Sequence, residues 1–322
     1  MIGWLARRVV QAIFVMLAMT VIVFIGVNVI GNPADILIPP DADQIERARV
    51  IAQLGLDKPL WEQYASFLWG VLHGDFGKSF VFGEPALKVI LQRMPATLEL
   101  ALVAMVFAVL VGIPLGLYAG LRPNAPGARA VMAISILGFS LPSFWVGLLL
   151  IMLFSVQLGW LPTGGRGETR EFLGMHWSFL TADGLRHLVL PALNLALFKI
   201  SLVMRLARAE TGEVMPQDYV RTAFAKGLSE GAVIRTHVLR NTLIPVATVV
   251  GLEFGSVIAF SVVTETIFAW PGMGKLIIDS IHLLDRPMIV AYLLVIVVLF
   301  IVINLVVDLI YASLDPRIRL EN

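Results

Sequence analysis

The chain has 322 residues, of which 58% are hydrophobic and 15% are charged, and its formal net charge is +1. Ordinary globular domains carry about 25% charged residues, so this composition excludes a disordered chain and disfavours a single soluble domain. The near-neutral charge leaves no basic excess for a nucleic-acid partner. Because the chain has no cysteine, disulfides, thiolate metal sites and cysteine nucleophiles are excluded as well. An integral membrane protein is the remaining class.

Six apolar runs can cross a bilayer as helices, which takes about 20 residues each. They cover residues 9–34, 100–121, 130–165, 187–204, 243–263 and 287–307. Arg7 and Arg8 precede the first run, as in a signal peptide, but its length and the lack of a small-residue cleavage site favour an uncleaved span. We expect Pro142 to kink the third run. The runs do not show the alternation of membrane β-strands.

The distribution of charge predicts the orientation. With the N-terminus inside, the inner segments hold 13 basic and 7 acidic residues, and the outer segments hold 11 basic and 16 acidic residues. Positive loops stay in the cytoplasm, so we expect both termini there. Residues 1–95 then form the first span and an outer segment with interfacial helices. Residues 96–322 form a five-helix core with a cytoplasmic loop at about 205–241.

The outer loop after the first span contains an amphipathic pattern. Apolar residues fall at helical spacing at Leu60, Tyr64, Phe67, Leu68, Val71 and Leu72. This pattern favours a helix lying at the membrane interface. Two roles fit such a helix equally well, namely packing on the outer ends of the spans and docking of a partner.

Motifs for catalysis or nucleotide binding are incomplete. The pairs Gly77-Lys78 and Gly274-Lys275 resemble the end of a P-loop. That motif also needs a glycine five residues earlier, where this chain has Leu72 and Ala269. Zinc-protease and rhomboid-type serine motifs are missing from the sequence, and its five histidines are far apart. We therefore expect no ATP site, metal site or catalytic residue in this chain.

Two charged residues interrupt the apolar runs, Lys199 in the fourth and Glu253 in the fifth. A charge inside a membrane span is costly and is a functional candidate by default. Lys199 can either snorkel to the cytoplasmic surface or line a water-filled path. Glu253 lies between Gly251 and Gly255, whose small size lets a helix or cavity come close. Both residues are candidates for lining a pathway, in a transporter subunit, a proton-coupled carrier or a channel.

The inner loop contains a compact polar segment at residues 218–230. Small residues at Ala223, Ala225 and Gly227 leave room for another surface to approach. Lys226 and Glu230 have the i,i+4 spacing of a shared helix face. The segment suits either a helix that docks onto a partner or a solvated connecting loop.

This segment resembles the EAA loop of ABC-importer permeases, whose pattern is E-A-A-x3-G-x9-I-x-L-P. Residues in register with the pattern are Ala223, Gly227 and Leu239, and residues that depart from it are Arg221, Thr222, His237 and Arg240. The departures are similar to the dipeptide/oligopeptide branch, which reads R-T-A-x-A-K-G-L-S-E and later L-R-N-x-x-I-P. Further segments similar to this branch lie at residues 31–34, 54–60, 74–77, 264–274 and 315–319. The chain looks like the B-type permease subunit of such an importer.

The resemblance implies an all-α integral membrane protein with six transmembrane helices of the type I ABC-importer permease kind, in the inner membrane of a bacterium. The implied partners are a second homologous permease subunit, two ATP-binding subunits, a periplasmic or lipid-anchored substrate-binding protein, and membrane lipid. ATP and Mg²⁺ bind to the ATPases, and the chain itself binds no cofactor. The resemblance further implies that closure of the ATPases moves the coupling segments and switches the pathway between outward-facing and inward-facing states.

The resemblance also assigns roles to residues. The expected ATPase contacts are Arg221, Thr222, Ala223, Lys226, Gly227 and Glu230. The expected contacts with the binding protein, or an outer gate, are Glu265, Phe268, Trp270 and Pro271. Dipeptides or oligopeptides are the expected substrates, with glutathione, nickel or another small solute as alternatives. A stand-alone secondary carrier is the alternative class, although the inverted repeat that many carriers show is not evident here.

Overall fold

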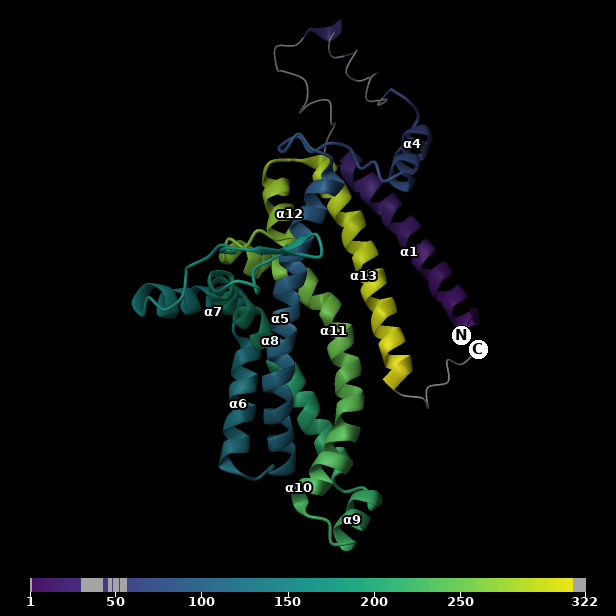
Figure 1. The fold of residues 1–322 in the computed structure, drawn as a ribbon. Coiled ribbons are helices and arrows are strands. Elements are labelled where there is room, and N and C mark those ends of the chain that lie inside the picture. Colours follow the sequence, from purple (N-terminus) through teal and green to yellow (C-terminus); the bar gives the residue numbers. More distant parts are fainter. Residues whose placement is uncertain (1, 30–42, 46–47, 49–51, 53–56, 315–322) are drawn as a thin grey trace. The chain divides into compact units, whose positions relative to one another are not determined.

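The computed structural model describes residues 2–29, 43–45, 48, 52 and 57–314. Long helices dominate this part of the chain (Figure 1), namely α1 (Ile2–Val29), α5 (Ala86–Leu121), α8 (Ala182–Val214), α11 (Leu239–Ile267) and α13 (Arg286–Leu314). Shorter helices are α4 (Leu60–Leu72), α6 (Pro126–Ser140), α7 (Ser143–Leu150), α9 (Asp218–Ala225), α10 (Glu230–Val233) and α12 (Met273–His282). Two π-helical segments are η1 (Ile151–Gln157) and η2 (Ile234–Val238). Strands β1 (Arg170–Phe172) and β2 (Met175–Trp177) form an antiparallel hairpin.

Five stretches of the described residues are helical, long and apolar enough to cross a membrane. They are Arg7–Gly26, Ala86–Leu121, Ala182–Val214, Glu230–Ile267 and Arg286–Leu309. A sixth crossing is present if α6 and the α7–η1 stretch count together as one span. These apolar helices agree with the predicted all-α membrane fold.

The third apolar run is broken rather than kinked. Helix α6 ends at Ser140, and the helix axis turns by 106° before the α7–η1 stretch begins. Leu141 and Pro142 both have extended backbone, with ψ of 138° and 133°. The residue before a proline is pushed out of the helical region by the proline ring, so the helix stops completely at this point. Figure 1 shows α6 running beside α8 and α7 leaving it sideways.

A row of glycines lets α5 approach α8 closely. Gly112, Gly116 and Gly120 recur every four residues along α5, and each faces α8. A Cβ atom on Gly116 would lie 2.4 Å from the carbonyl oxygen of Met204 and 2.7 Å from the Cβ of Ala207. Small residues at this spacing allow helix backbones to touch inside a membrane. The spacing of these glycines is visible in the sequence, but they lie inside an apolar run and are neither charged nor part of a loop.

Contacts divide the chain into two compact units. Among the described residues, the first contains those up to Gln92 together with Leu276–Val302, and the second contains Arg93–Lys275 and Ile303–Leu314. The predicted division of the chain at residue 95 stays a prediction. The segments at 31–34 and 315–319, residues 54–56 of that at 54–60, and the far end of the first apolar run lie outside the described residues.

In the first unit, α4 packs against α1 with one face. The hydroxyl oxygens of Tyr64 and Thr20 lie 2.9 Å apart, and the rings of Tyr64 and Phe24 meet edge to face at 5.3 Å. On the other face, Trp61 and Trp69 are exposed. The predicted helix and its packing on a span are therefore confirmed. A docking role for the exposed face stays a prediction.

Candidate functional site

The predicted coupling segment consists of two short helices separated by a tight turn. Helix α9 ends at Ala225, and the turn continues through Gly227, whose φ of +80° favours glycine. Helix α10 begins after Ser229 and continues through η2 into α11. Among the described residues, apart from Gly227 and its two chain neighbours, none has an atom within 4 Å of where a Cβ on Gly227 would stand. The turn is therefore open to an approaching surface.

Two expectations for this segment need correction. Lys226 and Glu230 do not share a helix face, because α9 ends at Ala225 and the turn at Gly227 lies between them. Ala223 does not face outward. It is buried in an apolar cluster whose other members are Val214, Val220, Val233 and Val238, with Leu117, Leu121 and Met215 packed against it. This cluster holds α9 against the ends of α5 and α8 and against α10 and η2.

Other residues of the segment form its exposed surface. Arg221, Thr222, Lys226, Gly227 and Glu230 are all exposed. The sequence analysis missed three exposed apolar side chains beside them, those of Tyr219, Phe224 and Leu228. Helical spacing alone does not single them out, because Tyr219 and Phe224 each lie four positions from a buried residue, Ala223 and Val220. The surface thus combines apolar and charged groups, as many protein interfaces do.

Lys199 and Glu253 form an ion pair between α8 and α11. The Lys199 ammonium contacts Glu253 Oε2 and donates to the Ser256 hydroxyl at 2.7 Å. The hydroxyl of Ser256 is also 2.6 Å from Glu253 Oε2. The side chains of Lys199 and Glu253 are 15% and 31% exposed. The structure thus brings together two residues that the sequence presented as separate candidates.

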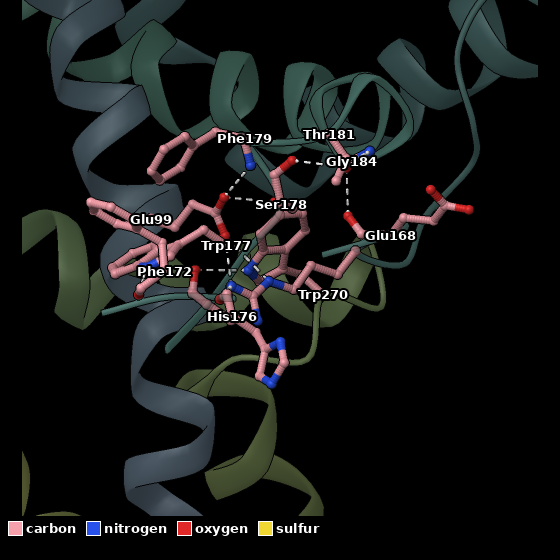
Figure 2. Close-up of polar contacts among 12 residues, drawn as sticks. Glu99, Glu168, Phe172, His176, Trp177, Ser178, Phe179, Thr181, Gly184 and Trp270 are labelled. Atoms are coloured by element: carbon pink, nitrogen blue, oxygen red, sulfur yellow. Dashed lines mark hydrogen bonds and ion pairs between the residues drawn. The ribbon is translucent and has the colours of Figure 1, made fainter. Parts of the chain in front are cut away.

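A second buried carboxylate, Glu99 on α5, holds the β1–β2 hairpin in place (Figure 2). Its Oε2 accepts hydrogen bonds from the Arg166 guanidinium at 2.7 and 3.2 Å. Its Oε1 accepts from the Ser178 hydroxyl and the Phe179 amide, both at 2.7 Å. Arg166 precedes β1 and Ser178 follows β2, so one carboxylate fixes both ends of the hairpin.

The tip of this hairpin is apolar and exposed. Phe172 is 55% exposed and Leu173 is 79% exposed. Leu173 has a φ of +54°, and Gly174 after it has +73°. Below the tip, Arg166 donates to the carbonyl of His176 at 2.6 Å and the Trp177 indole donates to that of Phe172 at 3.1 Å. The hairpin therefore presents two apolar side chains on a fixed base.

A third buried carboxylate, Glu265, ties the turn between α11 and α12 to α5. It accepts hydrogen bonds from the Thr97 hydroxyl at 2.8 Å and from the backbone amide of Lys275 at 2.9 Å. The Trp270 indole donates to the carbonyl of Ala96 at 2.9 Å. Gly272 packs on the carboxylate so closely that a Cβ there would lie 2.4 Å from it.

The expectation of direct contact with the binding protein is corrected for three of these residues, whereas the alternative role as an outer gate stays a prediction. Glu265, Phe268 and Trp270 are fully or almost fully buried, and only Pro271 reaches the surface in part. Their side chains build the turn and do not face a partner. The residues that were missed, Glu99 and Arg166, are separated by 67 positions. No local pattern in the sequence shows such a pair.

The apolar helices define a multi-pass membrane protein. Matches to family models show to which family of membrane proteins the chain belongs. The model described as "Binding-protein-dependent transport system inner membrane component" matches residues 112–320. A second model, for the N-terminal part of the same kind of component, matches residues 1–101. The chain belongs to this family. It is a permease subunit of an ABC importer in the inner membrane and is not itself an enzyme.

Three similar proteins illustrate the relationship. The dipeptide transport system permease protein DppB of Escherichia coli K12 is 37% identical over 338 residues, with 99% of each chain covered. The di/tripeptide permease protein DppB of Pseudomonas aeruginosa UCBPP-PA14 is 40% identical over 333 residues, with 99% of each chain covered. The glutathione transport system permease protein GsiC of Salmonella typhimurium LT2 is 40% identical over 320 residues, also with 99% of each chain covered.

The fold is also similar to a solved structure. A chain of the MetNI methionine ABC transporter, in an inward-facing conformation, superposes with a TM-score of 0.56. The match covers 70% of this chain and 96% of that one, at 18% sequence identity. At this identity the similarity concerns the fold alone.

Proposed function

We propose that this chain is one of two homologous permease subunits that together carry dipeptides or oligopeptides across the inner membrane. Two partner subunits bind and hydrolyse ATP with Mg²⁺, and a periplasmic or lipid-anchored protein delivers the substrate. The chain binds no cofactor of its own. It crosses the membrane six times, with α6, α7 and η1 acting as one broken span, and both termini lie in the cytoplasm.

The observation that carries this proposal is the end-to-end similarity to permeases of peptide transport systems. The exposed turn at Gly227 supports it, because a docking surface for a partner is what a transport subunit without an energy source of its own requires. Charge supports the orientation, because basic residues outnumber acidic ones on the α9 side and acidic residues outnumber basic ones on the other side.

The test is uptake of a labelled dipeptide by proteoliposomes that contain the complete system. Uptake should require the binding protein and ATP inside the vesicles, in the compartment that holds the ATPases. Uptake by this chain alone, without ATP, would instead identify a secondary carrier. Glutathione is the second candidate substrate, because a glutathione permease is as similar as the peptide permeases. Preferential uptake of glutathione over dipeptides by the same vesicles would identify glutathione as the substrate.

The coupling role of α9 predicts a severe effect of bulk at Gly227. Gly227→Trp should reduce ATP-dependent uptake at least tenfold, because the side chain blocks docking of the ATPase at the exposed turn. Gly227→Asn is the matched control, since asparagine tolerates the left-handed backbone and is small. The measurement is uptake together with co-purification of the ATPases. Normal uptake and assembly of Gly227→Trp would contradict the coupling role.

The exposed hairpin tip is the better candidate for contact with the binding protein. The chain has no cysteine, so single-cysteine variants need no other change. Leu173→Cys should react with a membrane-impermeant maleimide from outside the cell and should crosslink to the binding protein. Ala225→Cys in α9 is the matched control, which should react only after the membrane is opened. A reversed labelling pattern would overturn the orientation, and a failure of Leu173→Cys to crosslink in any nucleotide state would rule out this contact.

A further inference from the structure

The Lys199–Glu253–Ser256 group leaves some of its hydrogen-bonding capacity unused. Within the described part of the chain, Glu253 Oε2 receives the ammonium and the serine hydroxyl, whereas Oε1 has no hydrogen-bond partner. An ammonium has three N–H donors, and Lys199 directs two of them to Glu253 and Ser256. One acceptor and one donor therefore remain side by side at a partly exposed point of the chain.

Lys199 and Glu253 each lie within a candidate membrane span, and facing lipid there would carry a high free-energy cost. A charged side chain at the centre of a span is costly to insert into a membrane. Charges inside membranes therefore face a bundle interior or a water-filled cavity. On α11, Leu252 and Phe260 lie one and seven positions from Glu253 in the sequence and are 53% and 69% exposed. Mostly apolar walls with a few polar groups are the usual composition of a small-molecule site.

We infer that Lys199, Glu253 and Ser256 form a transient binding site for the backbone of a transported peptide. In an extended peptide, the N–H and C=O of one residue point to the same side, as they do in a sheet. The N–H can donate to Glu253 Oε1 while the C=O accepts from the Lys199 ammonium. Such contacts involve only the backbone of the peptide and none of its side chains, so the site accepts peptides of many sequences. The inference rests on the proposed function and adds the pathway site and its ligand chemistry.

The test replaces both charged residues by apolar residues of similar size, Lys199→Met together with Glu253→Leu. Replacing a buried ion pair in this way is often neutral for stability, so the chain should still fold. The matched control makes the same two changes at Lys88 and Glu84, which form an exposed ion pair of 3.2 Å outside this group. Dipeptide uptake by the Lys199/Glu253 variant should fall at least tenfold at equal amounts of assembled complex, and the control should match the wild type.

A direct readout identifies the site itself. A dipeptide carrying a photoreactive diazirine should label α8 or α11 near Lys199 and Glu253 in the wild-type complex and should lose this labelling in the double variant. Wild-type uptake by the double variant, or labelling confined to other helices, would overturn the inference and leave the pair a purely structural one. Failure of the wild-type system to take up dipeptides would instead overturn the proposed function.

Discussion

Glu99→Ala should lower the free energy of unfolding by about 3–5 kcal/mol, because it removes one member of a buried ion pair and leaves the other charged. The side chain of Glu99 is fully buried, and that of Arg166 is only 12% exposed. The change also deprives the Ser178 hydroxyl and the Phe179 amide of their acceptor. The measurement is the thermal unfolding of the purified chain, combined with trypsin cleavage after Arg170 in the released hairpin.

Two variants make this prediction specific. Glu171→Ala removes an exposed glutamate from the same hairpin and should leave both readouts unchanged. Glu99→Met combined with Arg166→Met removes both charges and should recover much of the stability, because the isolated buried charge is gone. Wild-type unfolding and wild-type trypsin resistance of Glu99→Ala would show that the hairpin does not depend on this carboxylate.

Gly116→Leu should prevent correct packing of α5 on α8. A Cβ added at this position would lie 2.4 Å from a backbone oxygen of Met204. This oxygen cannot move aside as the end of a flexible side chain could. Even Gly116→Ala should cost about 1–3 kcal/mol, the usual penalty of overpacking. The expected result for leucine is loss of folded protein from the membrane, measured by size-exclusion chromatography after extraction in detergent.

The matched control is another helical glycine with open space around it. Gly212 lies on α8, and no atom lies within 4 Å of where its Cβ would stand. Gly212→Ala should be neutral or slightly stabilising, because alanine favours the helix by up to about 1 kcal/mol. If Gly116→Leu accumulates in the membrane and elutes like the wild type, close approach of α5 and α8 is not required for folding.

Much of the architecture could be predicted from the sequence. Long apolar runs predict membrane helices, because every backbone N–H and C=O group must be hydrogen-bonded within the bilayer and a helix does this within one segment. A helix was predicted from the helical spacing of apolar residues between Leu60 and Leu72, and α4 covers this stretch. The family was recognisable from the segment at 218–230, where residue types and spacing carry the information directly.

The predictions that failed concern the direction in which side chains point. Glu265, Phe268 and Trp270 lie in a segment that reads as an exposed loop, yet they are buried against α5 at Ala96 and Thr97. Ala223 looked like part of a docking surface and is part of a core. Pro142 was expected to kink a helix and instead separates two helices at 106°. For the buried residues the outcome depends on which distant element packs against the segment, whereas at Pro142 it depends on the local backbone of Leu141 and Pro142.

The sequence by itself thus determined the class of protein, its apolar helices and the family, because these depend on composition, periodicity and local motifs. Only the tertiary structure decided the partners of the costly charges. Glu99 meets Arg166, and Lys199 meets Glu253, across separations of 67 and 54 residues. Removing a charge from water is costly unless a counter-charge or hydrogen bonds compensate it, and chain folding rather than chain order brings these partners together.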